Sequence, residues 1–265
     1  MIAQTNGKNN KSRFFFAFLL TKYVTGLIIF TTKMCERRKT TVELEGKIID
    51  FLGDSITEGV GVKDIENNRY DNVLRRTYKL AATYNYGIGG TRLAHQIKAS
   101  AKPRIDLCFC GRAYDIDPRA DIVVVYGGVN DFLHGDAPIG SREDTTPATY
   151  WGGVNFLMTY LPERFKNGTV VFLTPARAGN ETFSDETPLR RHMARGDAIP
   201  LVGYVDIINE AGKMHGVPVL DLYRNLSINP NIESDRVKYT ADGLHLNDAG
   251  HAVLAKLLGD FLTSL

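Results

Sequence analysis

The sequence predicts an α/β fold with a parallel β-sheet. From about residue 44 onward, short apolar runs alternate with longer amphipathic runs about five times, which is the pattern of repeated strand–helix units. The clearest strand lies at Asp121–Tyr126, where Ile122-Val123-Val124-Val125 form an unbroken β-branched run. Such a run is typical of a strand covered by helices on both faces. A composition of 43% hydrophobic and 23% charged residues is that of a globular domain and excludes a disordered chain.

The remaining elements follow from the same alternation. Residues 47–52 are expected to form a strand, because an apolar run there lies between charged residues and a glycine. Residues 67–80 place Val73, Leu74 and Tyr78 on one face of a helix. Short apolar runs predict further strands, and apolar residues at every third or fourth position predict further helices. These strands lie at 82–86, 169–173 and 217–222, and these helices at 148–165, 198–215 and 247–262.

The slight basic charge of the chain belongs to its N-terminal end. The whole chain has a formal charge of +2, whereas residues 1–33 hold five basic residues and no acidic residue. The other 232 residues therefore carry a net charge of −3. We expect no nucleic-acid partner, because a basic domain surface is the usual mark of one.

The N-terminal segment permits three interpretations. The apolar run at residues 14–32 is about as long as a membrane span, but Lys22 lies near its centre and no small-residue cleavage site of a signal peptide follows. Residues 1–33 are an extension of the gene model before a start at Met34, an uncleaved anchor or signal, or an additional helix. We divide the chain into an N-terminal extension, 1–46, and a globular domain, 47–265.

Polar and small residues follow the predicted strands, at the edge of the sheet where α/β folds bind ligands. Gly53-Asp54-Ser55 follows the first strand, Gly89-Gly90 the second and Gly128-Val129-Asn130-Asp131 the third. A serine on a glycine turn before a helix is the setting of an exposed nucleophile, or alternatively of a helix cap. An asparagine amide there can donate to an oxyanion, or bond its own backbone in a turn.

Asp242 and His245 complete the candidate site from the last loop. An aspartate three residues before a histidine can bind Nδ1 of the ring and leave Nε2 facing outward as a base. The alternative is a surface histidine beside a helix cap. A nucleophile, two oxyanion donors and an Asp–His pair together predict one catalytic site at this edge.

These four blocks, in this order, resemble the SGNH (GDSL) hydrolase family from about residue 47 to the C-terminus. The resemblance implies a three-layer α/β/α sandwich around a five-stranded parallel sheet in flavodoxin-like order. It implies ester hydrolysis through an acyl-enzyme, without a metal or other cofactor. In this family pattern Ser55 is the nucleophile, His245 the base and Asp242 the residue that orients the base.

The resemblance also implies an oxyanion hole. Its donors would be the backbone N–H groups of Ser55 and Gly90 and the side-chain amide of Asn130. Gly89 is the competing candidate for the second block. Gly90 is preferred because it lies five residues after Asn85, as the family pattern suggests.

The expected activity is that of an esterase, lipase or acylhydrolase acting on a small-molecule carboxylic ester with an acetyl or other short acyl group. Acyl transfer by the same triad is the first alternative. A metallophosphoesterase is a weaker one, because its Asp-x-His pair after the first strand is missing: Leu52 stands two places after Asp50. The sequence assigns no substrate-binding residue and no oligomeric state, since specificity depends on loop shape.

Other reactive residues receive structural interpretations. His251 is expected to be structural rather than a metal ligand beside Asp242 and His245. His134 is expected on an exposed loop, the alternative being that it lines the substrate cleft. Loops 132–149 and 175–200 leave strand ends and are candidate walls of the substrate site, the arginines of the second loop forming a solvated face. These arginines are Arg177, Arg190, Arg191 and Arg195.

The three cysteines indicate a reducing compartment. Cys108 and Cys110 are too close in sequence for a comfortable disulfide, and with Cys35 they are interpreted as free thiols. A cytoplasmic protein is therefore expected. Membrane anchoring or export is the alternative if residues 14–32 are a real anchor.

Overall fold

The computed structural model describes residues 42–179 and 199–265, and this part of the chain carries the predicted parallel sheet. Its strands hydrogen-bond in the order β2-β1-β3-β4-β5, and every neighbouring pair is parallel. This is the flavodoxin-like order, so the predicted fold class is confirmed. The strands are β1 (Ile48–Gly53), β2 (Ala82–Gly87), β3 (Ile122–Tyr126), β4 (Thr169–Leu173) and β5 (Val219–Leu220).

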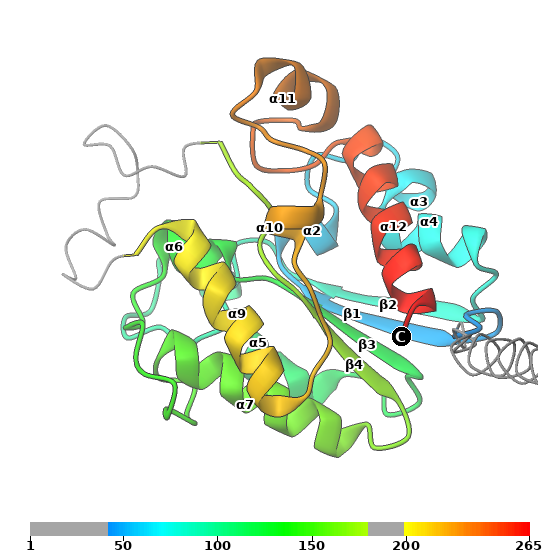
Figure 1. The fold of residues 1–265 in the computed structure, drawn as a ribbon. Coiled ribbons are helices and arrows are strands. Elements are labelled where there is room, and N and C mark those ends of the chain that lie inside the picture. Colours follow the sequence, from blue (N-terminus) through cyan, green and yellow to red (C-terminus); the bar gives the residue numbers. More distant parts are fainter. Residues whose placement is uncertain (1–41, 180–198) are drawn as a thin grey trace, which may run out of the picture. The chain divides into compact units, whose positions relative to one another are not determined.

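Helices cover both faces of the sheet and make the three layers (Figure 1). The helices α4 (Tyr70–Thr77) and α12 (Asp248–Thr263) pack on one face, and α5 (Phe109–Arg112), α7 (Tyr150–Arg164) and α9 (Leu201–His215) pack on the other. Successive side chains of a strand point to opposite faces. In β1, Phe51 therefore joins the core under α4 and α12, while Leu52 joins the core under α7 and α9.

The predicted helix at 67–80 is interrupted. It divides into α3 (Ile65–Asn68) and α4, because the backbone of Arg69 is extended (φ −67°, ψ 137°). The Asp64 side chain caps α3 by accepting from Asn67 N–H, and the Arg69 guanidinium pairs with the carboxylate of Asp71. Asp64 therefore fixes where α3 begins, and the extended backbone at Arg69, whose side chain pairs with Asp71, stops a helix that apolar periodicity alone extends through this point.

The last strand is shorter than predicted. The run at 217–222 forms only the two residues of β5, because Asp221 caps α10 (Leu222–Asn225) by accepting from Arg224 N–H. Five further short elements were not predicted: α5, α6 (Val129–His134), α11 (Glu233–Tyr239), and the 3₁₀ turns Pro103–Asp106 and Ala113–Asp115. Three to seven residues are too few for a periodic signal.

No helix within residues 42–179 and 199–265 is long and apolar enough to span a membrane. The apolar run at 14–32 lies outside the described residues, as do Cys35 and three arginines of the 175–200 loop, Arg190, Arg191 and Arg195.

Candidate active site

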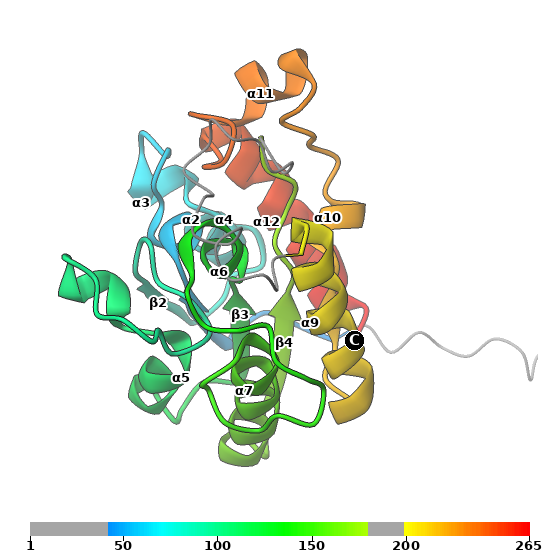
Figure 2. The ribbon, with the colours of Figure 1, turned by 90° about the vertical axis from the view of Figure 1, so that its left-hand side faces the viewer.

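The strand-end motifs meet because the first three strands end level with one another. Gly53 at the end of β1 pairs with Gly87 of β2 and with Tyr126 of β3. Figure 2 looks toward this edge, with α2 (Ser55–Glu58) and α6 near its centre. The side chain of Asp54 caps α2 by accepting from Ile56 N–H at 3.0 Å. This turn places Ser55 at the first position of α2.

Ser55, His245 and Asp242 form a continuous hydrogen-bonded chain. His245 Nε2 lies 3.0 Å from Ser55 Oγ, and His245 Nδ1 lies 2.6 Å from Asp242 Oδ2. The loop that carries the pair is closed by a bridge between Thr240 and Leu246. Because a carboxylate only accepts, Nδ1 carries the proton and the Nε2 lone pair faces the serine hydroxyl.

The backbone of this loop holds the Asp242 carboxylate in place. Asp242 Oδ1 accepts from Leu244 N–H at 3.0 Å and from His245 N–H at 2.8 Å. Partial burial raises the pKa of Asp242, but the hydrogen bonds from the His245 ring and from these two N–H groups outweigh burial and leave the pKa below its ordinary value. The carboxylate is therefore charged at neutral pH.

Two backbone N–H groups at this edge of the sheet have no acceptor among the described residues. The N–H of Ser55 opens α2 and the N–H of Gly90 lies in the loop after β2, and neither donates to any group within the described residues. The N–H of Gly89 is engaged, because it donates to Glu58 Oε2 at 2.7 Å. Of the two glycines, Gly90 is thus the one with a free donor. Its φ of +78° is a conformation that favours glycine.

The Asn130 amide is held from both ends. Its Nδ2 donates to the Thr91 carbonyl at 3.1 Å and lies 3.4 Å from Asp54 Oδ2. Its Oδ1 lies 3.0 Å from Nε2 of His134, one turn further along α6. Asn130 is 5% exposed, so its orientation is set by protein groups rather than by solvent.

Buried charges hold the loops that carry these donors. Asp131 accepts from the N–H groups of Leu93 and Ala94 at 2.9 and 3.1 Å, and burial raises the pKa of Asp131 to about 7. Arg112 donates to the Gly53 carbonyl at 3.0 Å and to the hydroxyl of Thr91 at 2.9 Å. Burial lowers the pKa of Arg112 to about 10, so the guanidinium stays charged.

Burial also raises the pKa of Asp54, to about 6, while the Ile56 N–H, His245 and Arg112 oppose this rise. The Asp54 side chain is charged above that pH and lies beside the Asn130 amide. Sequence reasoning did not find the supporting roles of Glu58, Arg112 and His134. Glu58 and Arg112 act on backbone atoms far away in the chain, which no local motif records, and His134 bonds Asn130 one helical turn away on α6, an element that was not predicted.

The predictions for two histidines outside the triad compare differently with the structure. His251 is fully buried, its Nδ1 accepts from Tyr70 N–H at 3.2 Å, and burial lowers its pKa to about 4. The prediction of a structural histidine is confirmed. The prediction of an exposed loop for His134 is wrong, because this residue lies on α6, is half-buried and bonds both Asn130 and Arg92.

Cys108 and Cys110 are free and buried. Burial raises the pKa of both thiols, so neither is activated as a nucleophile. Within residues 42–179 and 199–265, no group of three His, Cys, Asp or Glu side chains is placed to hold a metal ion.

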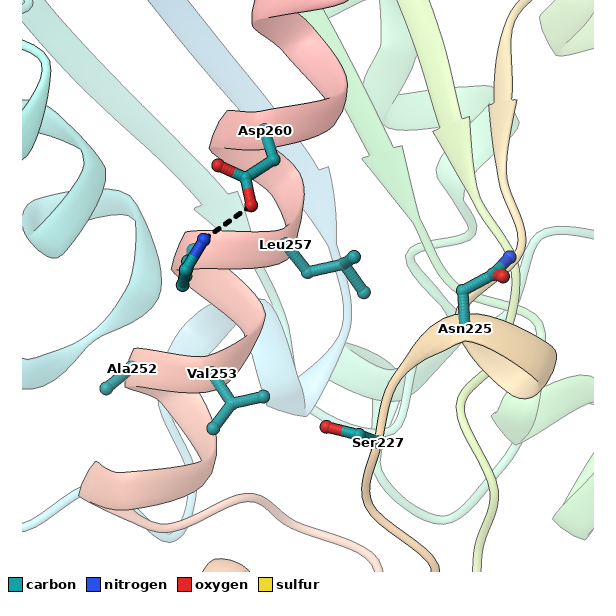
Figure 3. Close-up of a pocket in the computed structure, with 7 residues that line it drawn as sticks. Asn225, Ser227, Ala252, Val253, Leu257 and Asp260 are labelled. Atoms are coloured by element: carbon teal, nitrogen blue, oxygen red, sulfur yellow. Dashed lines mark hydrogen bonds and ion pairs between the residues drawn. The ribbon is translucent and has the colours of Figure 1, made fainter.

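Two hollows differ in their relation to the triad. A cavity of about 10 Å³ is lined by direct neighbours of the candidate site residues, among them Ile56, Val129 and Leu244. A hollow of about 380 Å³ lies between α12 and the residues around α10, where Val253 and Leu257 face Ser227 (Figure 3). None of the candidate site residues lines either hollow, but only the smaller one is lined by their neighbours in the sequence.

The fold is that of the SGNH class of hydrolases. The sequence model of the GDSL-like Lipase/Acylhydrolase family matches residues 51–253, and the chain belongs to this family. The family supports the hydrolysis of esters as the general activity. No curated protein matches the chain in sequence.

Solved structures share the fold over nearly their whole length. A protein from Lactobacillus plantarum is 27% identical, with 83% of this chain and 98% of that chain covered and a TM-score of 0.68. A lipase/acylhydrolase from Enterococcus faecalis is 20% identical (82% and 95% covered, TM-score 0.52). An acetyl xylan esterase is 22% identical (80% and 98% covered, TM-score 0.53).

Proposed function

We propose that the protein is a carboxylic ester hydrolase that uses Ser55 as its nucleophile and forms an acyl-enzyme. The observation that carries this proposal is the unbroken chain from Ser55 Oγ through the His245 ring to the Asp242 carboxylate. A serine hydroxyl is a weak nucleophile until a base accepts its proton, and this chain supplies the base in the required tautomer.

The reaction follows from these positions in two halves. His245 Nε2 takes the proton of Ser55 Oγ as this oxygen bonds to the ester carbonyl carbon. The resulting oxyanion accepts from the N–H groups of Ser55 and Gly90 and from Asn130 Nδ2. His245 then returns the proton to the leaving alcohol, the C–O bond breaks, and the acyl group remains on Ser55. Water attacks the acyl-enzyme with His245 as base; His245 then returns this proton to Ser55 Oγ as the bond from Oγ to the acyl carbon breaks, and the carboxylic acid leaves.

The small cavity beside the triad supports a short acyl group. Its volume of about 10 Å³ leaves room for about one water molecule. Its lining is mostly apolar and includes Ile56, Val129 and Leu244, with one charged side chain, that of Arg177. An acetyl methyl group is of this size. We therefore propose acetyl esters and other short-chain esters as substrates, and one structural neighbour is an acetyl xylan esterase.

Ser55→Ala tests the nucleophile. This variant should lose turnover of p-nitrophenyl acetate and should no longer be labelled by a fluorophosphonate, while its melting temperature stays that of the wild type. Ser227→Ala is the matched control, because Ser227 lies in the hollow away from the triad, and it should keep full activity. Wild-type turnover in Ser55→Ala would overturn the proposal.

Two further measurements define the reaction. We expect kcat/KM to fall along the p-nitrophenyl series from acetate to octanoate, whereas a preference for octanoate would contradict the short acyl site. Activity that is unchanged by EDTA supports the metal-independent mechanism over a metallophosphoesterase. Product analysis with competing alcohols separates hydrolysis from acyl transfer by the same triad. We also propose a cytoplasmic location, which fractionation of cells would test.

A further inference from the structure

A buried chain of side chains runs from the proposed oxyanion hole to the loop after β2. Asn130 Oδ1 lies 3.0 Å from His134 Nε2, and His134 Nδ1 lies 3.0 Å from a terminal nitrogen of Arg92. The other terminal nitrogen of Arg92 donates to Asp106 Oδ1 at 2.9 Å. Arg92 is 3% exposed. The proposed triad contains none of Arg92, His134 and Asp106.

The chemistry of this chain determines which nitrogen of His134 carries the proton. A guanidinium only donates hydrogen bonds, so the contact with Arg92 requires His134 Nδ1 to accept. The neutral ring then has its proton on Nε2, and Nε2 donates to Asn130. The atom of Asn130 that faces His134 must therefore be the oxygen Oδ1.

The other end of the amide agrees with this assignment. If the Asn130 amide were turned over, Oδ1 would face the Thr91 carbonyl, which only accepts, and the amide NH₂ would face the Nε2–H of His134. Both hydrogen bonds would be lost, because two acceptors would face each other at Thr91 and two donors would face each other at His134. The arrangement with Arg92 and His134 in place thus keeps Nδ2 on the side of the Thr91 carbonyl and of Asp54, the residue before Ser55.

We propose that His134 and Arg92 are positioning residues for the oxyanion hole, which act by holding the Asn130 amide with its NH₂ toward the developing oxyanion. This proposal rests on the proposed function of Ser55 and Asn130. It predicts an effect on kcat rather than on KM, because an oxyanion donor acts mainly in the transition state.

His134→Phe removes the donor to Asn130 Oδ1 and keeps an aromatic ring. We expect kcat for p-nitrophenyl acetate to fall about tenfold with KM nearly unchanged, which is less than the 10²–10³-fold loss typical of deleting an oxyanion donor. His134→Gln can place an amide NH₂ near the former Nε2 position. It should recover most of the lost kcat, whereas a ring that only fills space would not be replaced by glutamine.

A double-mutant cycle separates positioning from general stabilisation. In the Asn130→Ala background, His134→Phe should lower kcat less than twofold further, because the group that it positions is absent. His215→Phe is the matched control. His215 Nε2 also bonds an asparagine oxygen, that of Asn155 at 3.0 Å, but away from the triad. This control should leave kcat at the wild-type value.

These experiments distinguish a failure of the positioning role from a failure of the proposed esterase function. If Ser55→Ala is inactive and His134→Phe keeps wild-type kcat, the positioning role is overturned and the esterase proposal stands. A full tenfold loss from His134→Phe in the Asn130→Ala background also overturns it. Where His134→Phe folds poorly by melting temperature, Arg92→Lys provides the same test. Lysine keeps a donor toward Nδ1, so the proposal requires Arg92→Lys to retain more kcat than Arg92→Met.

Discussion

The Asp242→Asn substitution tests how the carboxylate selects the tautomer of His245. Asp242 Oδ1 accepts from two backbone N–H groups, and Oδ2 accepts from the His245 ring at 2.6 Å. An asparagine has only one oxygen for these three donors. The two backbone N–H groups cannot turn away from Oδ1, so the amide oxygen takes that place and the amide NH₂ faces the ring.

The reversed contact should leave His245 with the wrong tautomer. The asparagine NH₂ donates to Nδ1, so the ring proton moves to Nε2, which then cannot accept the proton of Ser55. In the serine-protease triad this substitution lowers kcat about 10⁴-fold through the wrong tautomer, with the geometry intact. We expect a loss of about 10³–10⁴-fold here, by the same mechanism.

Asp242→Ala is the informative comparison. The Asp242 side chain is 53% exposed, so water can replace the carboxylate and either tautomer becomes available to the ring. We expect Asp242→Ala to retain about tenfold more kcat than Asp242→Asn, although alanine is the larger chemical change.

The measurement is kcat for p-nitrophenyl acetate near pH 8, with the rate of fluorophosphonate labelling of Ser55 as a second readout. Melting temperatures of both variants control for folding. Equal kcat values for the two variants, or a higher value for Asp242→Asn, would refute the tautomer argument.

Three other predictions follow from contacts around the site. Gly61→Ala places a Cβ 3.2 Å from His245 Cβ at a φ of +94°, so kcat should fall and the melting temperature drop; an unchanged kcat would contradict this. Glu58→Ala frees the N–H of Gly89 and should lower kcat about tenfold through a looser oxyanion loop, whereas Glu58→Gln, which keeps an acceptor, should not. Burial raises the pKa of Asp50 to about 7 from 3.8. The wild type should therefore lose up to about 4 kcal/mol of stability between pH 4 and 7. The free energy of unfolding of Asp50→Asn, measured in urea, should not show this loss. If the wild type and Asp50→Asn differ in their free energy of unfolding by the same amount at pH 5 and at pH 8, the prediction is contradicted.

The sheet was predictable because its signals are local and strong. The β-branched run of β3 and the apolar run of β1 indicate strands by composition alone, and both lie within one residue of the predicted bounds. The helix at 67–80 was predicted as one element because periodicity does not register the pairing of Arg69 with Asp71, which interrupts it.

Some residues of the candidate site also have a local signal in the sequence, and others do not. Asp242 and His245 are three residues apart, so their spacing alone suggested a contact, and the structure brings them to 2.6 Å. The strand-end blocks could be found because the carboxyl ends of parallel strands lie at one edge of the sheet. The order of strands and loops was therefore enough to assign Ser55, Gly90 and Asn130 to the same edge.

The groups that hold Asn130 in place have no such signal. Arg92 and His134 are 42 residues apart, and they meet only because the loop after β2 returns over the start of α6. That path is set by Asp131, whose carboxylate binds two backbone N–H groups of the loop. Asp131 thus places the loop that carries Arg92, and in the proposed arrangement Arg92 selects the tautomer of His134, which orients Asn130. These contacts exist only in the folded chain. We therefore expect a substitution at Asp131, Arg92 or His134 to lower kcat through a change in the orientation of the Asn130 amide.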